Sequence, residues 1–113
     1  MRKWIALGAS GLLLGTLASG RATAAEDGKA LFVDRCASCH GETGNADTKK
    51  GKAAKSKSYH EAELKAKLVA ADGEAFVTKN VRTNKKHKNV NKKVTDEELA
   101  AIAAYVKVLA ATP

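Results

Sequence analysis

Both cysteines of this chain lie three positions apart, at Cys36 and Cys39, and His40 follows the second directly. Three chemistries use cysteines at this spacing. A structural zinc site needs four ligands, but the chain has no second cysteine pair, and His60 and His87 lie far apart in sequence. A thioredoxin-like redox motif needs a strand-to-helix setting, which the sequence does not predict. The spacing therefore favours the third chemistry, covalent attachment of haem.

In that chemistry each thiol adds to one vinyl group of the porphyrin, and the adjacent histidine binds the iron as proximal ligand. One turn of helix is enough to place both sulfurs alongside the ring. The alternative is a bare disulfide between Cys36 and Cys39, with His40 incidental. We predict one haem c, attached through two thioether bonds from Cys36 and Cys39, with His40 on the iron.

The N-terminus has the plan of a secretory signal peptide. Two basic residues precede the apolar run Trp4–Ala18, and small residues follow it. We expect cleavage after Ala24 or Ala25, so that residues 1–25 are the signal peptide and residues 26–113 form one domain. An uncleaved anchor is the alternative, although the apolar run is short for a bilayer. Export to the periplasm would suit a tethered haem, and no stable membrane insertion is expected after cleavage.

Charge is uneven in the 88 residues of the expected domain. They carry 17 basic and 12 acidic side chains, a net charge of +5, and between Lys49 and Lys93 the local excess reaches +10. Such a basic block attracts acidic partners or polyanions, and a merely solvated surface is the alternative. We expect acidic redox proteins as partners. Export and scarce aromatic residues argue against nucleic acid.

Three helices are predicted from the apolar pattern. The first runs from about Asp27 into the cysteine motif. The second begins at Ser58, where Glu61 three residues later completes a capping box, and the third begins in the same way at Thr95 with Glu98. Apolar residues at steps of three and four mark the third helix most clearly, and it reaches almost to the C-terminus.

Two polar stretches are predicted to be long loops, residues 41–57 and residues 79–93. The dipeptide Asp72-Gly73 is predicted to end the second helix. No alternating apolar pattern long enough for a sheet is present. The predicted class is all-α, with about three main helices and long loops, and wrapping around a bound group would explain loops of this length.

The sequence resembles the monohaem class I cytochromes c. The stretch "GKALFVDRCASCHG" is similar to their first helix and haem motif, and "VTDEELAAIAAYVKVL" is similar to their last helix. The resemblance implies the small α-helical cytochrome c fold around one haem. It also implies that Tyr105 meets Phe32 and Gly28 where the two helices cross.

One departure from that family concerns the sixth iron ligand, which is usually a methionine on the loop before the last helix. The only methionine here is Met1, which signal cleavage would remove. In many relatives the ligand lies about nine residues before the acidic first turn of the last helix, and counting back from Asp96 reaches His87. We therefore predict His87 as distal ligand, opposite His40. The alternatives are His60, a lysine such as Lys85, Lys86 or Lys88, and an open position.

Ligation by two histidines has chemical consequences. The reduction potentials of haem proteins span about 0.8 V, and the identity of the axial ligands is one of the factors that set them. Imidazole in place of a thioether stabilises ferric iron. The sequence thus predicts a low-spin, low-potential haem in a monomeric electron carrier that is not an enzyme. A gas-binding or sensing haem protein is the alternative. A peroxidase-like activity ranks lower, because no distal acid–base pair is evident.

A second departure is the absence of proline after the motif, since Pro113 is the only one. In the family, the carbonyl of such a proline accepts from the proximal imidazole. Some other group must orient His40 here. Candidate donors to the haem propionates are Tyr59, Asn80, Arg82 and Asn84.

Overall fold

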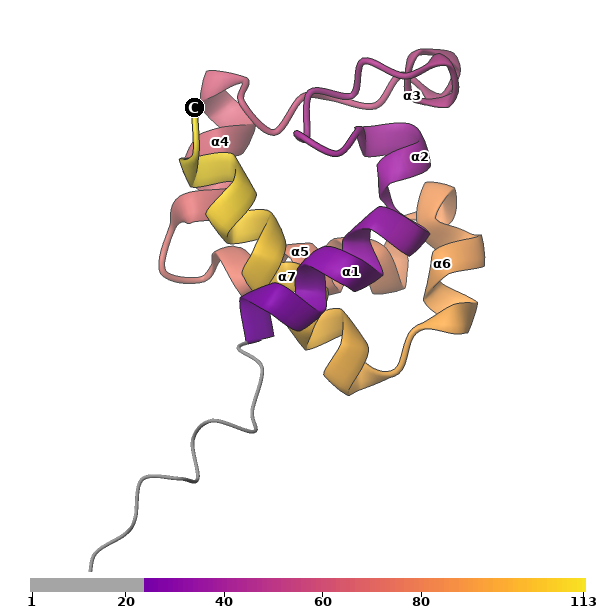
Figure 1. Ribbon diagram of the computed structural model, residues 1–113, viewed down its shortest axis with the longest axis vertical. Coiled ribbons are helices and arrows are strands. Elements are labelled where there is room, and N and C mark those ends of the chain that lie inside the picture. The colour runs from indigo at the N-terminus through magenta and orange to yellow at the C-terminus, as the bar shows by residue number, and fades with distance from the viewer. Residues whose placement is uncertain (1–23) are drawn as a thin grey trace, which may run out of the picture.

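The structure, a computed structural model, describes residues 24–113, and all regular structure within that range is helical (Figure 1). The all-α prediction is confirmed. No helix in this range is long and apolar enough to cross a membrane. The predicted signal peptide lies outside the described residues except for its last two. The elements are α1 (Ala24–Arg35), α2 (Ala37–His40), α3 (Lys49–Ala54), α4 (Ala62–Val69), α5 (Gly73–Thr83), the 3₁₀ helix η2 (Lys85–His87), α6 (Lys88–Lys93) and α7 (Asp96–Ala111).

The first and last helices cross closely, as the family resemblance implied (Figure 1). Gly28 of α1 lies directly against the backbone of α7, because a Cβ there would collide with the carbonyl oxygen of Ala101 and lie 2.9 Å from the Cβ of Tyr105. Phe32 is fully buried beside this crossing, and its ring centroid lies 5.5 Å from that of Tyr105. Glycine thus permits the contact, and the two aromatic rings fill the space next to it.

Helix α7 forms as predicted. The hydroxyl of Thr95 accepts from the backbone N–H of Glu98 at 3.1 Å, and the Glu98 carboxylate accepts from the N–H of Thr95 at 2.9 Å. This capping box satisfies two donors that the helix would otherwise leave without partners. Leu99, Ile102 and Val106 follow at helical spacing and are almost completely buried, so one face of α7 forms the centre of the core.

The second predicted helix begins later than the sequence suggested. Its N-cap is Glu61 and its first residue is Ala62. The Ser58 hydroxyl accepts from the backbone N–H of His60 at 3.0 Å, and the Ser58 N–H donates to the Glu61 carboxylate at 3.2 Å. Ser58 therefore forms a local turn through its side chain instead of capping a helix. Serine side chains often hydrogen-bond to nearby backbone groups in this way and compete with helix formation.

The predicted loop over residues 79–93 is wrong for most of its length, and the structure has more helices than three. Helix α5 begins at Gly73, so Asp72-Gly73 is a corner between α4 and α5, where a Cβ on Gly73 would collide with the carbonyl of Leu68. Val77 and Val81 lie on the buried side of α5. These two valines, one helical turn apart, give α5 a buried face, although the residues between and after them are mostly polar.

The predicted loop over residues 41–57 also contains a short helix, α3. Its N-cap hydroxyl, on Thr48, accepts from Gly51 at 2.9 Å and donates to the carbonyl of Ser38 at 2.8 Å. A Cβ on Gly51 would collide with the carbonyl of Cys39, so α3 lies tightly against α2. A single capping threonine and one glycine thus hold this segment against the cysteine motif.

Candidate haem site

A cavity of about 330 Å³ lies between α2, α4, α5, η2 and α7. Its size falls within the range of ligand pockets in proteins. Most of its lining is apolar and comes from three of the helices, with Leu64, Leu68, Phe76, Val77, Ile102 and Val106 among the contributors. Such a lining suits a large planar apolar group.

The cysteine motif presents its reactive atoms to this cavity. Cys36 caps α2, and its carbonyl accepts from the N–H groups of Cys39 at 3.2 Å and His40 at 3.0 Å. This single turn brings both thiols and the imidazole to the lining, and the thiols are not joined in a disulfide. Burial, with a smaller contribution from Cys39, raises the pKa of Cys36 to about 12. Cys36 is therefore a neutral thiol in the absence of a bound group.

Two histidines meet in the cavity. The ring centroids of His40 and His87 lie 6.0 Å apart, with 31° between their planes. A metal–imidazole bond is about 2 Å long, so two such bonds and the two half-rings span about 6 Å. The observed separation therefore fits one metal ion shared by the two rings. Among the described residues, no group of three or more His, Cys, Asp or Glu could hold a metal on its own.

Both imidazoles are kept neutral, which is the form that binds iron. Burial, reinforced by the neighbouring His87, lowers the pKa of His40 from 6.5 to about 4. Burial also lowers the pKa of His87, against the opposing effect of the backbone carbonyl of Asn80. The Nδ1 atoms of His40 and His87 are buried and have no hydrogen-bond partner.

The other candidates for the sixth ligand lie elsewhere or are engaged. Nε2 of His60 lies 2.8 Å from the carbonyl oxygen of Thr43, and His60 does not line the cavity. Lys85 and Lys88 are exposed and do not line it either. Lys86 does reach the cavity rim, where its Nζ donates to the carbonyl of Ala54 at 2.8 Å.

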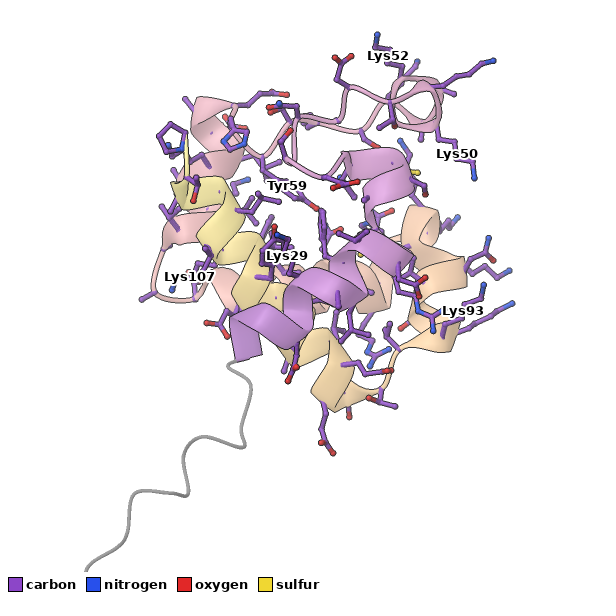
Figure 2. All side chains as sticks on the ribbon, in the orientation of Figure 1. Lys29, Lys50, Lys52, Tyr59, Lys93 and Lys107 are labelled. Atoms are coloured by element: carbon purple, nitrogen blue, oxygen red, sulfur yellow. The ribbon has the colours of Figure 1, made fainter. Side chains whose placement is uncertain are left out.

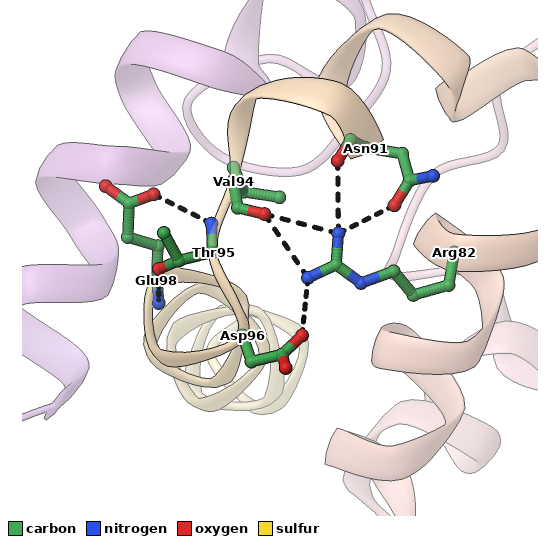
Figure 3. A network of polar contacts seen from close by, with 6 residues as sticks. All are labelled: Arg82, Asn91, Val94, Thr95, Asp96 and Glu98. Carbon is green, nitrogen blue, oxygen red and sulfur yellow. Dashed lines mark hydrogen bonds and ion pairs between the residues drawn. The ribbon is translucent and has the colours of Figure 1, made fainter.

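Three of the four predicted propionate donors, Tyr59, Asn80 and Asn84, line the cavity, but Arg82 does not. Its guanidinium instead joins α5 to the turn before α7 (Figure 3). It donates to the side chain of Asn91 at 2.7 Å, to the carbonyl of Val94 at 3.2 Å and to the carboxylate of Asp96 at 2.8 Å. Arg82 is thus a structural residue that fixes the segment between His87 and α7.

Sequence reasoning did not find the polar segment 55–57, which also lines the cavity. Lys55 ends α3 in the left-handed conformation, with φ of 60°, which is uncommon for a side chain of this kind. No pattern in the sequence marks this residue as part of the site, because its position depends on where α3 ends.

Comparison with known proteins agrees with this geometry. Residues 25–110 match the family described as Cytochrome c. The chain belongs to the cytochrome c family. Proteins of this family bind haem c covalently through thioether bonds, so haem c is the cofactor of this cytochrome. No curated protein and no solved structure matches the chain.

Proposed function

We propose that this cytochrome c is an exported, low-potential electron carrier whose iron is bound by His40 and His87. Cys36 and Cys39 attach the porphyrin. The observation that carries the proposal is the pair of neutral imidazoles 6.0 Å apart in one apolar cavity. The family supplies the coarser conclusion that this is a haem electron-transfer protein.

The bound haem supplies one-electron redox chemistry, and the chain sets its reduction potential. Two imidazoles favour ferric iron over ferrous iron more than a histidine–methionine pair does, so a low potential follows. The largely apolar lining would surround the iron with a medium of low polarity. If His40 and His87 both held the iron, electron transfer would need little rearrangement of ligands, and a substrate would have to displace one of them to bind.

The surface supports an acidic redox partner. Lys50, Lys52 and Lys93 all point outward (Figure 2) and are exposed, within the segment whose basic excess is +10. Opposite charge on the partner would increase the association rate, and salt would reduce it. We expect the rate of electron transfer with the partner to fall as ionic strength rises. A rate indifferent to salt would contradict this part of the proposal.

One observation favours a second candidate, a gas-binding haem protein. His87 closes a three-residue 3₁₀ helix, and neither η2 nor α6 contains a fully buried residue. A ligand held on such a segment could leave the iron and open a position for carbon monoxide or another diatomic gas.

Carbon monoxide binding to the ferrous protein separates the two candidates. We expect slow, incomplete binding to the wild type and fast, complete binding to His87→Ala. The matched control is His60→Ala, which removes a histidine outside the cavity and should bind as slowly as the wild type. Fast and complete binding to the wild type would contradict the electron-carrier proposal and favour the gas-binding candidate.

A further inference from the structure

The ring of Tyr59 lies against the ring of His40. Their centroids are 5.0 Å apart, and their planes are nearly parallel at 24°. Tyr59 is buried, with 9% of its surface exposed, and its side chain is directed into the interior (Figure 2). Stacking with an offset at this distance is a favourable arrangement for two aromatic rings.

His40 lacks the polar support that an iron-binding histidine usually has. Such a histidine normally donates its second ring N–H to a carbonyl or carboxylate, which fixes the rotation of the ring. Here Nδ1 of His40 is buried without a hydrogen-bond partner in the described part of the chain. No proline follows the motif until Pro113.

We infer that Tyr59 positions His40 by stacking, in place of that hydrogen bond. The inference rests on His40 as an iron ligand and does not require His87 to be one. Tyr59 is a positioning residue, since it acts on the iron only through the imidazole. Because the stacked ring does not accept a hydrogen bond from the Nδ1–H group, the imidazole donates less electron density to the iron than a hydrogen-bonded imidazole would.

Tyr59 is itself held firmly enough for this role. Its backbone N–H donates to the carbonyl of Gly44 at 2.8 Å, and its ring lies 6.2 Å from that of the buried Phe32. Gly44 has φ of 79°, and a Cβ there would lie 2.6 Å from Cδ2 of Tyr59. A glycine at this position is therefore what allows the tyrosine ring to reach His40.

The test compares Tyr59→Phe with Tyr59→Leu in the haem-loaded protein. Phenylalanine keeps the stacked ring and removes only the hydroxyl, whereas leucine removes the ring. Tyr105→Leu is the matched control, because Tyr105 also packs on Phe32 but does not line the cavity. The readouts are the paramagnetic shifts of the haem methyl protons in the ferric protein, which report the rotation of the axial imidazole, and the reduction potential.

We expect Tyr59→Leu to broaden and redistribute the haem methyl shifts. We also expect it to change the equilibrium constant for reduction of ferric to ferrous iron, obtained from the reduction potential, several-fold. Tyr59→Phe should keep the wild-type pattern, and Tyr105→Leu should lower stability while leaving the shifts unchanged. Wild-type shifts and potential in Tyr59→Leu would overturn the inference. A change in Tyr59→Phe as large as in Tyr59→Leu would also overturn it, because the hydroxyl would then be responsible.

A measurement that keeps Tyr59 covers the case in which Tyr59→Leu does not mature. In the ferrous carbon monoxide complex of His87→Ala, which is diamagnetic without His87, nuclear Overhauser contacts should join the ring protons of Tyr59 and His40. Their absence would overturn the inference. The result is separate from the carbon monoxide experiment, which concerns His87, so failure of one proposal is distinguishable from failure of the other.

Discussion

The two sides of the cavity hold their histidines by different means. On the proximal side, His40 lies in a turn packed between α1 and α3, next to the buried residues Phe32 and Tyr59. On the distal side, His87 ends η2, just before α6, and neither element contains a fully buried residue. Val90 of α6 is partly buried against the core, and Lys86 and Arg82 add polar contacts to this region. Fully buried residues thus surround one histidine, whereas partly buried and polar contacts near solvent hold the other.

This difference implies that the two ligands can be perturbed separately. Loss of packing on the proximal side should lower the stability of the whole domain, because the crossing of α1 and α7 is shared with the core. Loss of a polar contact on the distal side should mainly loosen the sixth ligand. Local openings of this kind occur where few apolar contacts hold a segment.

Acid should have the largest effect, because it would remove the proposed distal ligand, His87, completely. A proton and iron compete for the imidazole of His87, and burial already lowers its pKa below the ordinary 6.5. As pH falls, the protonated ring is released, so the spectrum should change from low-spin to high-spin well below pH 6.5. The measurement is an absorbance titration, with His87→Ala as the control that lacks this transition. Conversion at or above pH 6.5 would contradict the assignment.

Gly28→Ala should have the largest effect among the substitutions. A methyl group there collides with the Ala101 carbonyl, and overpacking of this kind costs about 2 to 3 kcal/mol. We expect a lower midpoint of thermal unfolding and less mature protein, with a normal low-spin spectrum in the protein that does mature. Lys29→Ala, at an exposed position of the same helix, is the control. Unfolding of Gly28→Ala at the wild-type temperature would show that the crossing is not tight.

Arg82→Ala sharpens the comparison on the distal side. It removes hydrogen bonds from a charged donor to Asn91 and Val94 and should cost about 2 kcal/mol. Asp96→Asn, in contrast, weakens the contact of Arg82 with a fully exposed carboxylate and removes one acidic charge from the first turn of α7, so it should cost less than Arg82→Ala. Thermal unfolding compares the two, and carbon monoxide binding to Arg82→Ala should be faster than to the wild type. Equal losses in both variants would mean that the ion pair, not the carbonyl contacts, holds this turn.

Lys86→Met should have the smallest effect. It removes one exposed hydrogen bond to the carbonyl of Ala54, worth about 1 kcal/mol, that links η2 to α3. Carbon monoxide should therefore displace His87 several-fold faster, with little change in thermal stability. Lys85→Met is the control, since Lys85 has no side-chain hydrogen bond among the described contacts. An equal change in both variants would assign the effect to charge alone.

The sequence predicted those features that depend on a short motif or on a regular apolar spacing. The Cys36–His40 run predicted the attachment turn, and the capping box of Thr95 with a regular apolar stripe predicted α7. Counting back from Asp96 selected His87, whose ring centroid lies 6.0 Å from that of His40, and its role as an iron ligand stays a prediction. Helix α5 was missed because its buried face consists mainly of Val77 and Val81 in a polar context. The stacking of Tyr59 on His40 depends on tertiary approach and leaves no local pattern.

The central claim is that two imidazole nitrogens bind the iron. Electron–nuclear double resonance on the ferric protein, with nitrogen-15 incorporated only in histidine, tests it most directly. We predict strong coupling to two histidine nitrogens in the wild type and to one in His87→Ala, with His60→Ala unchanged. Coupling to a single histidine nitrogen in the wild type would contradict the account.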